Sequence, residues 1–429
     1  MMLVIISDLH FTDGTTSNWS KGQDLFNISP KAFKLFVSKI SNIVERRKNI
    51  EKVTFIYNGD IFDLLRTEAW FEISADSHPW SIPLKKEIVY ERCKDILENT
   101  MNHKQNRESL AWLNGTHDDF QDVWKVGADI DRVYIPGNHD RIINLSQPCR
   151  SLVYKNLLQE TGSSIFNNFY KDQDFHKALV MHGHESDAYN CELNKKGRPI
   201  YKDIPIGDPM TTMLFSRLGY EANQLNIPKE AKRRFREIDN VRPTLATVRY
   251  VKDLIKEFKI EKKVKEILNE IVKDFENIEY VDKWLSEHDK WNFRYDEADK
   301  LQVALRAIKL LGTSLPSGLL EKLADLVRDE SCQKYALRQL RSDLGRDFLY
   351  CVFGHTHEHI HIPLYIENGV ERHYLNSGTF RTTFSQTYDE SVFTRFQRMS
   401  FVIIYGPKEY DHNEDNPIYE SWSGLRMHH

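Results

Sequence analysis

The chain has few cysteines, no long apolar run and no dominant sign of charge. Its 429 residues include five cysteines without a CxxC pair, which argues against a disulfide framework and favours reduced thiols in a cytoplasmic protein. The start lacks the basic segment of a signal peptide and no apolar stretch is long enough to cross a bilayer, so we expect a soluble protein with no membrane span. Lys and Arg number 59 against 63 Asp and Glu, so the overall charge offers no attraction to nucleic acid.

What is present begins with a strand, a helix and a second strand. Residues 3–7 form an apolar run that predicts a strand. Ser29 and Pro30 provide an N-cap and a first helical position for a helix that reaches about residue 49. Residues 52–57 predict the next strand, and both strands end in acidic loops. This βαβ unit predicts an α/β fold.

The same arrangement recurs three times, at predicted strands 132–135, 178–181 and 348–353, each followed by a polar loop. Loops at the carboxyl ends of strands are where α/β sheets gather ligands. The five loops together supply Asp8, His10, Asp60, Asn138, His182, His355 and His357. Mixed oxygen and imidazole donors suit divalent manganese first, with iron or zinc as alternatives. The donors suffice for two ions, and a carboxylate-bridged pair of metals suits the hydrolysis of phosphate esters.

The order of these loops resembles that of the calcineurin-like metallophosphoesterases. The motifs are D-x-H at Asp8, G-D-x-x-D at Gly59, G-N-H-D at Gly137, H-G at His182 and G-H-x-H at Gly354. Each motif alone is weak evidence, whereas five in the family's order, each after a predicted strand, are specific. The resemblance covers about residues 1–188 and 347–379. It implies a metallophosphoesterase-type β-sandwich flanked by helices.

The resemblance also implies roles for the individual residues. The implied metal ligands are Asp8, His10 and His357 for one ion, Asn138, His182 and His355 for the other, and Asp60 as the bridge between them. His139 is then no ligand, but the residue that protonates the leaving oxygen or stabilises the transition state beside a metal-activated hydroxide. Asp63 is expected to orient the His139 ring.

Three neighbouring residues have competing interpretations. His184 lies two residues after His182; because the family takes the histidine before the glycine, we expect His184 to lie behind the ligands or to face the phosphate. Arg141 either contacts the substrate phosphate bidentately or forms an ordinary ion pair. Asp140 is expected to accept the hydrogen bonds that close its turn.

Residues 203–346 differ in character from the rest of the chain. They contain long, charged, helix-favouring stretches, such as 251–278 and 317–344, without a strand signature. We therefore predict a helical insertion, as a lid or side domain, within a discontinuous catalytic domain of residues 1–202 and 347–429. Residues 229–265 hold 13 Lys or Arg against 6 Asp or Glu, a pattern that fits either a track for a nucleic-acid backbone or the solvated face of a charged helix.

The leading functional hypothesis is binuclear metal-dependent hydrolysis of phosphate esters, with a preference for phosphodiester or nucleotide substrates. Leu64 follows Asp63, where the protein phosphatases of the family carry an arginine, which weakens the interpretation as a protein phosphatase. A nuclease acting on DNA or RNA is the alternative within the enzyme class. A metal-binding interaction scaffold without activity is the alternative from another class.

Overall fold

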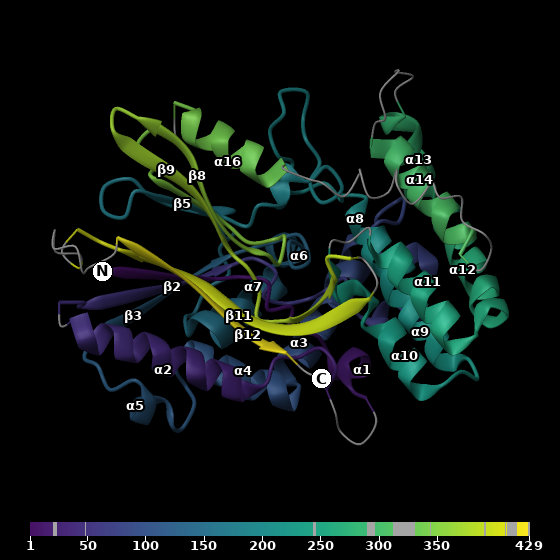
Figure 1. The fold of residues 1–429 in the computed structure, drawn as a ribbon, viewed down its shortest axis with the longest axis horizontal. Helices are drawn as coiled ribbons and strands as arrows, with labels where there is room; N and C mark the ends of the chain where they lie inside the picture. Colours follow the sequence, from purple (N-terminus) through teal and green to yellow (C-terminus); the bar gives the residue numbers. More distant parts are fainter. Residues whose placement is uncertain are drawn as a thin grey trace.

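The computed structural model describes residues 1–19, 24–47, 49–242, 246–289, 297–311, 331–343, 345–389, 392–407, 409 and 418–427. The fold is mixed α/β, with two mixed sheets and many helices (Figure 1). The first sheet has the order β3 (Asp129–Ile135), β2 (Lys52–Asn58), β1 (Met2–Ile6), β11 (Phe393–Tyr405), β10 (Thr382–Gln386) and β6 (Val241–Arg242), with β12 (Tyr419–Met427) paired to β11. The second has the order β4 (Phe169–Asp172), β5 (Ala178–Met181), β7 (Tyr350–Phe353), β9 (Val370–Ser377) and β8 (His359–Glu367).

Strand β1 shows how the sequence sets the layers. Alternate side chains of a strand point to opposite faces of its sheet. Met2, Val4 and Ile6 accordingly pack in the core on the helical side of the first sheet, whereas Leu3 and Ile5 pack against the second sheet. Because β1 is buried on both faces, it consists of an unbroken apolar run.

The two sheets share one apolar core and are covered by helices on their outer faces. Residues of β1, β2, β3 and β11 meet residues of β5, β7 and β9 in that core. Helices α2 (Pro30–Arg47), α3 (Lys86–Asn102) and α4 (Lys104–Asn114) supply the core beneath the first sheet, and α16 (Ser331–Arg341) packs on the second (Figure 1). The prediction that a helix begins at Pro30 is confirmed, and its buried residues Phe33, Phe36, Val37 and Ile40 follow helical spacing.

A separate cluster of helices lies beside the sheets, on the right of Figure 1. It includes α8 (Gly207–Pro209), α9 (Arg217–Gln224), α10 (Lys229–Arg236), α11 (Thr247–Phe258), α12 (Glu261–Glu276), α13 (Glu279–His288) and α14 (Glu297–Lys309). These helices share an apolar core with Leu254, Leu268 and Phe275 among its fully buried members. Among the described residues, no helix combines the length and the apolar character that a bilayer crossing requires.

Three features differ from the sequence prediction. Residues 203–346 do contain a strand, β6, which pairs in parallel with β10 at Phe384 and Ser385. The sequence predicts one helix between β2 and β3, at residues 84–101, where α3 lies; a second helix, α4, begins after His103, whose backbone is not helical. Within the predicted helical stretch 317–344, α16 lies on the second sheet through Tyr335 and Leu340, while residues 317–330 and 344 lie outside the described part of the chain.

Candidate metal centre

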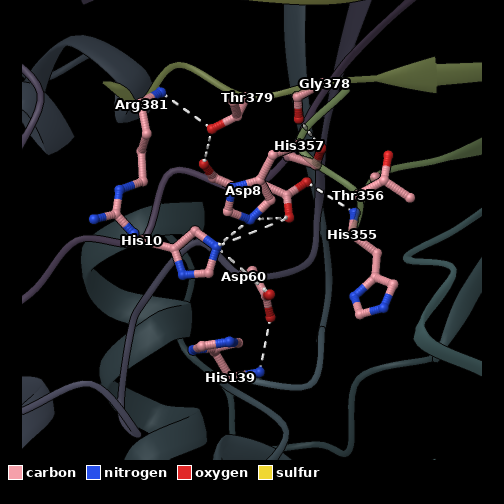
Figure 2. A network of polar contacts seen from close by, with 12 residues as sticks. Asp8, His10, Asp60, His139, His355, Thr356, His357, Gly378, Thr379 and Arg381 are labelled. Atoms are coloured by element: carbon pink, nitrogen blue, oxygen red, sulfur yellow. Dashed lines mark hydrogen bonds and ion pairs between the residues drawn. The ribbon is translucent and has the colours of Figure 1, made fainter. Parts of the chain in front are cut away.

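The polar loops meet at the carboxyl ends of five strands, as Figure 2 shows for four of them. Asp8 and His10 follow β1, Asp60 follows β2, Asn138 and His139 follow β3, His182 follows β5, and His355 and His357 follow β7. The side chains of Asp8, His10, Asp60, His182 and His357 are at most 6% exposed. The sequence therefore brings polar side chains from distant segments into one buried cluster.

Asp8, His10 and His357 form a first group that could hold a metal ion. His10 Nε2 lies 3.0 Å from His357 Nε2, and Asp8 Oδ1 lies 3.3 Å from His357 Nε2 and 3.9 Å from His10 Nε2. Donors bound to one ion at about 2.1 Å stand roughly 3.0–3.4 Å apart. The spacing of these donor atoms is therefore close to that of ligands around one small cation.

Asp8, Asp60 and His182 form a second such group, and Asp60 also joins His10 and His139 in a third. Asp60 Oδ2 lies 3.3 Å from His182 Nε2 and 3.6 Å from His10 Nε2. A single carboxylate thus lies between donors of two groups, as a bridging ligand would. The structure brings His182 rather than His184 to Asp60.

Asn138 and His355 extend the second group on its outer side. Asn138 Oδ1 lies 3.1 Å from His355 Nδ1, and the His355 backbone N–H donates to Asp8 Oδ2 at 3.0 Å. The amide oxygen and the ring nitrogen therefore face each other, as two ligands of one ion do.

Two unpartnered atoms test whether a cation fits this cluster. Asp8 Oδ1 and His182 Nε2 are buried without a hydrogen-bond partner among the described residues, an arrangement that is costly unless a ligand satisfies them. His182 Nδ1 donates to the Asn58 carbonyl at 2.9 Å, which directs Nε2 toward Asp60. Burial lowers the pKa of His182, but Asp60 and Asp8 outweigh it and raise that pKa to about 10. The site thus favours a positive charge at Nε2, which a metal ion could supply in place of a proton.

The carboxylates are held ionised by the rings around them. Burial alone would raise the pKa of Asp8, but His357, His10 and His182 hold it well below its usual range. The pKa of Asp60 is likewise depressed, because His182, His139 and His10 outweigh the effect of burial. Ionised carboxylates and histidine rings together make a set of ligands suited to a divalent transition metal.

His139 and Asp63 form a pair attached to this cluster. Asp63 Oδ1 lies 2.9 Å from His139 Nδ1, and Asp63 Oδ2 lies 3.0 Å from His10 Nδ1. The His139 backbone N–H donates to Asp60 Oδ1 at 2.8 Å. Burial lowers the pKa of His139, but Asp63 and Asp60 raise it to about 9. The ring is therefore protonated at neutral pH, and its 13% exposed side chain can be reached from outside.

The backbone of the loops is strained where the side chains converge. Of the nine described non-glycine residues with a positive φ, five lie in these loops: Asp8 at 54°, His10 at 47°, Asp60 at 53°, His355 at 69° and His357 at 60°. Each such residue costs about 1–3 kcal/mol and persists only where the surroundings enforce it. Strain of this kind clusters at functional sites.

Two motif glycines allow the loops to approach one another. A Cβ at Gly59, where φ is 80°, would lie 2.3 Å from His182 Nδ1. A Cβ at Gly354 would lie 2.5 Å from Asp8 Oδ2. Any side chain at either position would collide with a member of the cluster, so the glycines have a steric cause.

The remaining predicted residues have defined places. His184 is buried behind the cluster, with its ring centroid 5.4 Å from that of His182 and its Nδ1 3.8 Å from Glu185 Oε2. Arg141 forms a buried ion pair with Asp208, the second of its two interpretations. Asp140 accepts the backbone N–H of Gly137 in its own turn and that of Ile61 in the Asp60 loop.

The structure also places residues at the centre that the sequence analysis did not single out. Asp187 Oδ2 lies 3.2 Å from His355 Nε2, and Arg242 Nη2 lies 2.9 Å from His357 Nδ1. Thr379 Oγ1 donates to the Asp8 carbonyl at 2.7 Å (Figure 2). Asp187 was detectable in principle because it closely follows the His182 loop, whereas no local pattern marks Arg242.

No protein-family model matches the chain, and no curated protein matches it.

Proposed function

We propose that the protein hydrolyses phosphate esters with two divalent metal ions, favouring phosphodiester or nucleotide substrates. The observation that carries the proposal is the Asp60 carboxylate between donor groups that could each hold a cation. The motifs shared with the calcineurin-like metallophosphoesterases support the same assignment. Manganese is the first candidate, with iron or zinc as alternatives.

The proposed division of labour follows the donor geometry. Asp8, His10 and His357 would hold one ion, Asn138, His182 and His355 the other, and Asp60 would serve both. We further propose that residues 1–202 and 347–429 form the catalytic domain, interrupted by residues 203–346. When bound, the two cations polarise the phosphoryl oxygens and lower the pKa of the attacking water.

The protein's own residues would supply the proton for the leaving group. Hydrolysis adds the water oxygen to phosphorus and breaks the bond between phosphorus and the leaving oxygen, and a leaving alkoxide oxygen takes up a proton as it departs. We assign this proton to His139, which is cationic at neutral pH. Asp63 lies against Nδ1, so the transferable proton is on Nε2. Asp63 acts through His139 as a positioning residue.

The ion pairs of the basic stretch at residues 229–265 bear on the alternative of a nuclease. In the basic stretch, Arg233 pairs with Glu230 and Glu237, and Arg234 pairs with Glu257. Arg236 is buried against Glu68. Three of its cations are thus engaged within the protein, which favours the interpretation of a charged helix face over that of a nucleic-acid track.

Metal titration tests the proposal and separates an enzyme from an inactive scaffold. Chelator-treated protein is reloaded with manganese, zinc or ferrous iron, bound metal is counted by elemental analysis, and hydrolysis of bis(4-nitrophenyl) phosphate is followed. We expect two ions per chain, with activity that rises as the second ion binds. Two bound ions without hydrolysis of any phosphomonoester, phosphodiester or nucleotide would favour the scaffold, and the absence of bound metal would contradict both.

A further inference from the structure

A second charged cluster, which the proposed hydrolysis does not use, lies beside the metal centre. It consists of three arginines from distant segments: Arg66 after β2, Arg242 in β6 and Arg381 before β10. Arg66 and Arg381 are 3% and 2% exposed, and their guanidinium carbons lie 5.7 and 5.8 Å from the centroid of the Phe26 ring. Figure 2 shows the Arg381 side chain running beside His10. We refer to these three residues as the arginine cluster.

The arginine cluster has more cations than carboxylates of its own. Arg66 forms an ion pair with Asp239, and its Nε lies 3.6 Å from Asp63 Oδ2. Asp63, however, is already shared between His10 and His139. Asp8 and Glu358 also act on Arg242, but Asp8 belongs to the metal centre. Among the described residues, Asp239 thus lies among all three arginines; it also helps to raise the pKa of His139, but it belongs to none of the groups that could hold a metal ion.

Electrostatic repulsion within the arginine cluster lowers the pKa values of Arg381 and Arg242. Burial and the charge of Arg66 lower the pKa of Arg381 to about 9. Burial and Arg66 also lower the pKa of Arg242, although Asp239 opposes them. The arginine cluster thus holds like charges close together in a buried place. Buried like charges are costly unless an anion accompanies them.

Buried N–H groups of the arginine cluster also indicate a site for an anion. Arg381 Nη1 and Arg66 Nε are buried and have no hydrogen-bond partner among the described residues. A buried guanidinium N–H without an acceptor loses its interaction with water and gains nothing in return. Arg381 Nη1 therefore lacks an acceptor, and Arg66 Nε has only the long contact of 3.6 Å with Asp63 Oδ2.

The contact of Arg242 with His357 determines whether Arg242 can bind an anion as well. An arginine can only donate, so its contact at His357 Nδ1 places the proton of a neutral ring on Nε2, the atom that faces Asp8. A histidine that binds a metal through Nε2 instead carries its proton on Nδ1. With a metal ion at Nε2, Nδ1 could not accept from Arg242, and the Arg242 guanidinium would then be available to another acceptor.

We propose that the arginine cluster is a subsite for a second anionic group of the substrate, a phosphate separate from the ester that is cleaved. This inference rests on the proposed function, because it places the cleaved ester at the adjoining metal centre. Asp239 neutralises part of the cluster in the absence of substrate and gives way to the incoming phosphate. The preferred substrates are therefore phosphate esters that carry at least one further phosphate.

A matched pair of substrates measures the subsite. The first is thymidine 5′-(4-nitrophenyl phosphate), and the second is the same molecule with a phosphate on its 3′ oxygen. Both release nitrophenolate from the same diester, so the ratio of their kcat/KM values reports only the added phosphate. Charge-assisted hydrogen bonds to a buried arginine predict a preference of about 10- to 100-fold for the second substrate.

Variants then assign that preference to the arginine cluster. Arg381→Gln and Arg66→Gln should each bring the ratio toward one, whereas Asp239→Asn should raise it by removing the competing carboxylate. Because the two rates are measured on the same protein sample, loss of metal or of folded protein cancels in the ratio. Arg46→Gln, on the exposed face of α2, is the matched control and should keep the wild-type ratio. A wild-type ratio near one, or a preference that survives both arginine substitutions, would overturn the proposal.

A binding measurement separates failure of the subsite from failure of the proposed hydrolysis. Calorimetry compares thymidine 3′,5′-bisphosphate with thymidine 5′-phosphate on the manganese-loaded protein. We expect the bisphosphate to bind about 10- to 100-fold more tightly, and Arg381→Gln to remove that difference. If neither nitrophenyl substrate is cleaved, the proposed hydrolysis fails, and the calorimetric ratio alone decides for or against the subsite.

Discussion

The metal-centre loops and the helical cluster bury opposite kinds of side chain. In the loops, buried side chains are polar, the backbone of five residues is strained, and two acceptor atoms lack partners among the described residues. In the helical cluster, the buried side chains are apolar and most of the charged side chains lie outside. The loops thus hold their metal-ligand donors in a fixed geometry at a cost in local stability. The helices are stabilised by apolar packing, which many different sequences could provide.

The difference has a consequence for mutational effects. Changes at the loops should alter metal content or turnover more than stability, because the groups there are unsatisfied without a ligand. Changes in the core of the helical cluster should alter stability more than chemistry. The four predictions that follow test this contrast, from the largest expected effect on catalysis to the smallest.

Asp60→Asn should have the largest effect. The Asp60 carboxylate lies between His182 and His10 and accepts the N–H of His139, so a neutral amide weakens both metal groups at once. We expect metal content to fall below two ions per chain, and turnover to fall by more than in any variant of His139. Elemental analysis and the bis(4-nitrophenyl) phosphate assay measure the two effects. Unchanged metal content would show that Asp60 is not shared between two ions.

His139→Ala should lower the turnover of substrates with an alkoxide leaving group by about 100- to 10,000-fold, the usual range for loss of a general acid. Metal content should remain at two ions, because we assign His139 to proton transfer and not to metal binding. His361→Ala, on the exposed part of β8, is the control and should keep both activity and metal. Loss of metal from the His139 variant would instead make His139 a ligand, as its place in a group with His10 and Asp60 allows.

The pH dependence of kcat/KM should report the protonation state of His139. The pKa of His139 is raised to about 9, and the protonated form is the active one. Activity should therefore fall as the pH rises through that pKa. Bound cations compete for Asp60 and oppose a nearby positive charge, so the midpoint should lie at or below about pH 9. His139→Ala should lack this descending limb; a limb that persists would have another origin.

Leu254→Ala should have the smallest effect on the chemistry. Leu254 is fully buried in the helical cluster, and its truncation should lower the free energy of unfolding by about 2–5 kcal/mol. Urea denaturation measures this change, and metal content should stay at two ions. Leu35→Ala, at a residue 57% exposed, should change stability by less than about 0.5 kcal/mol. Loss of metal from the Leu254 variant would show that the two regions are not separable.

The sequence predicts the loops better than their surroundings, and the reason is physical. The strands before Asp8, Asp60 and His182 are signalled by apolar runs followed by an acid, with a glycine in the second and third of these loops. Each feature has a local steric or chemical cause. The helix boundary at His103 has no such cause, since its neighbours favour helix equally well. Arg242 reaches His357 only because β6 pairs with β10, and a pairing between segments more than a hundred residues apart leaves no mark in either segment.

The pairing of β6 with β10 also covers part of the edge of the first sheet. Strand β6 contributes only two residues, Val241 and Arg242, alongside Phe384 and Ser385, yet it covers the free side of β10. An uncovered strand of this kind offers its backbone to any other chain that can add to it. Removal of residues 203–346 would therefore expose the backbone of β10 at the edge of the sheet, together with one flank of the metal centre. Loss of function in such a truncated protein would then partly reflect aggregation.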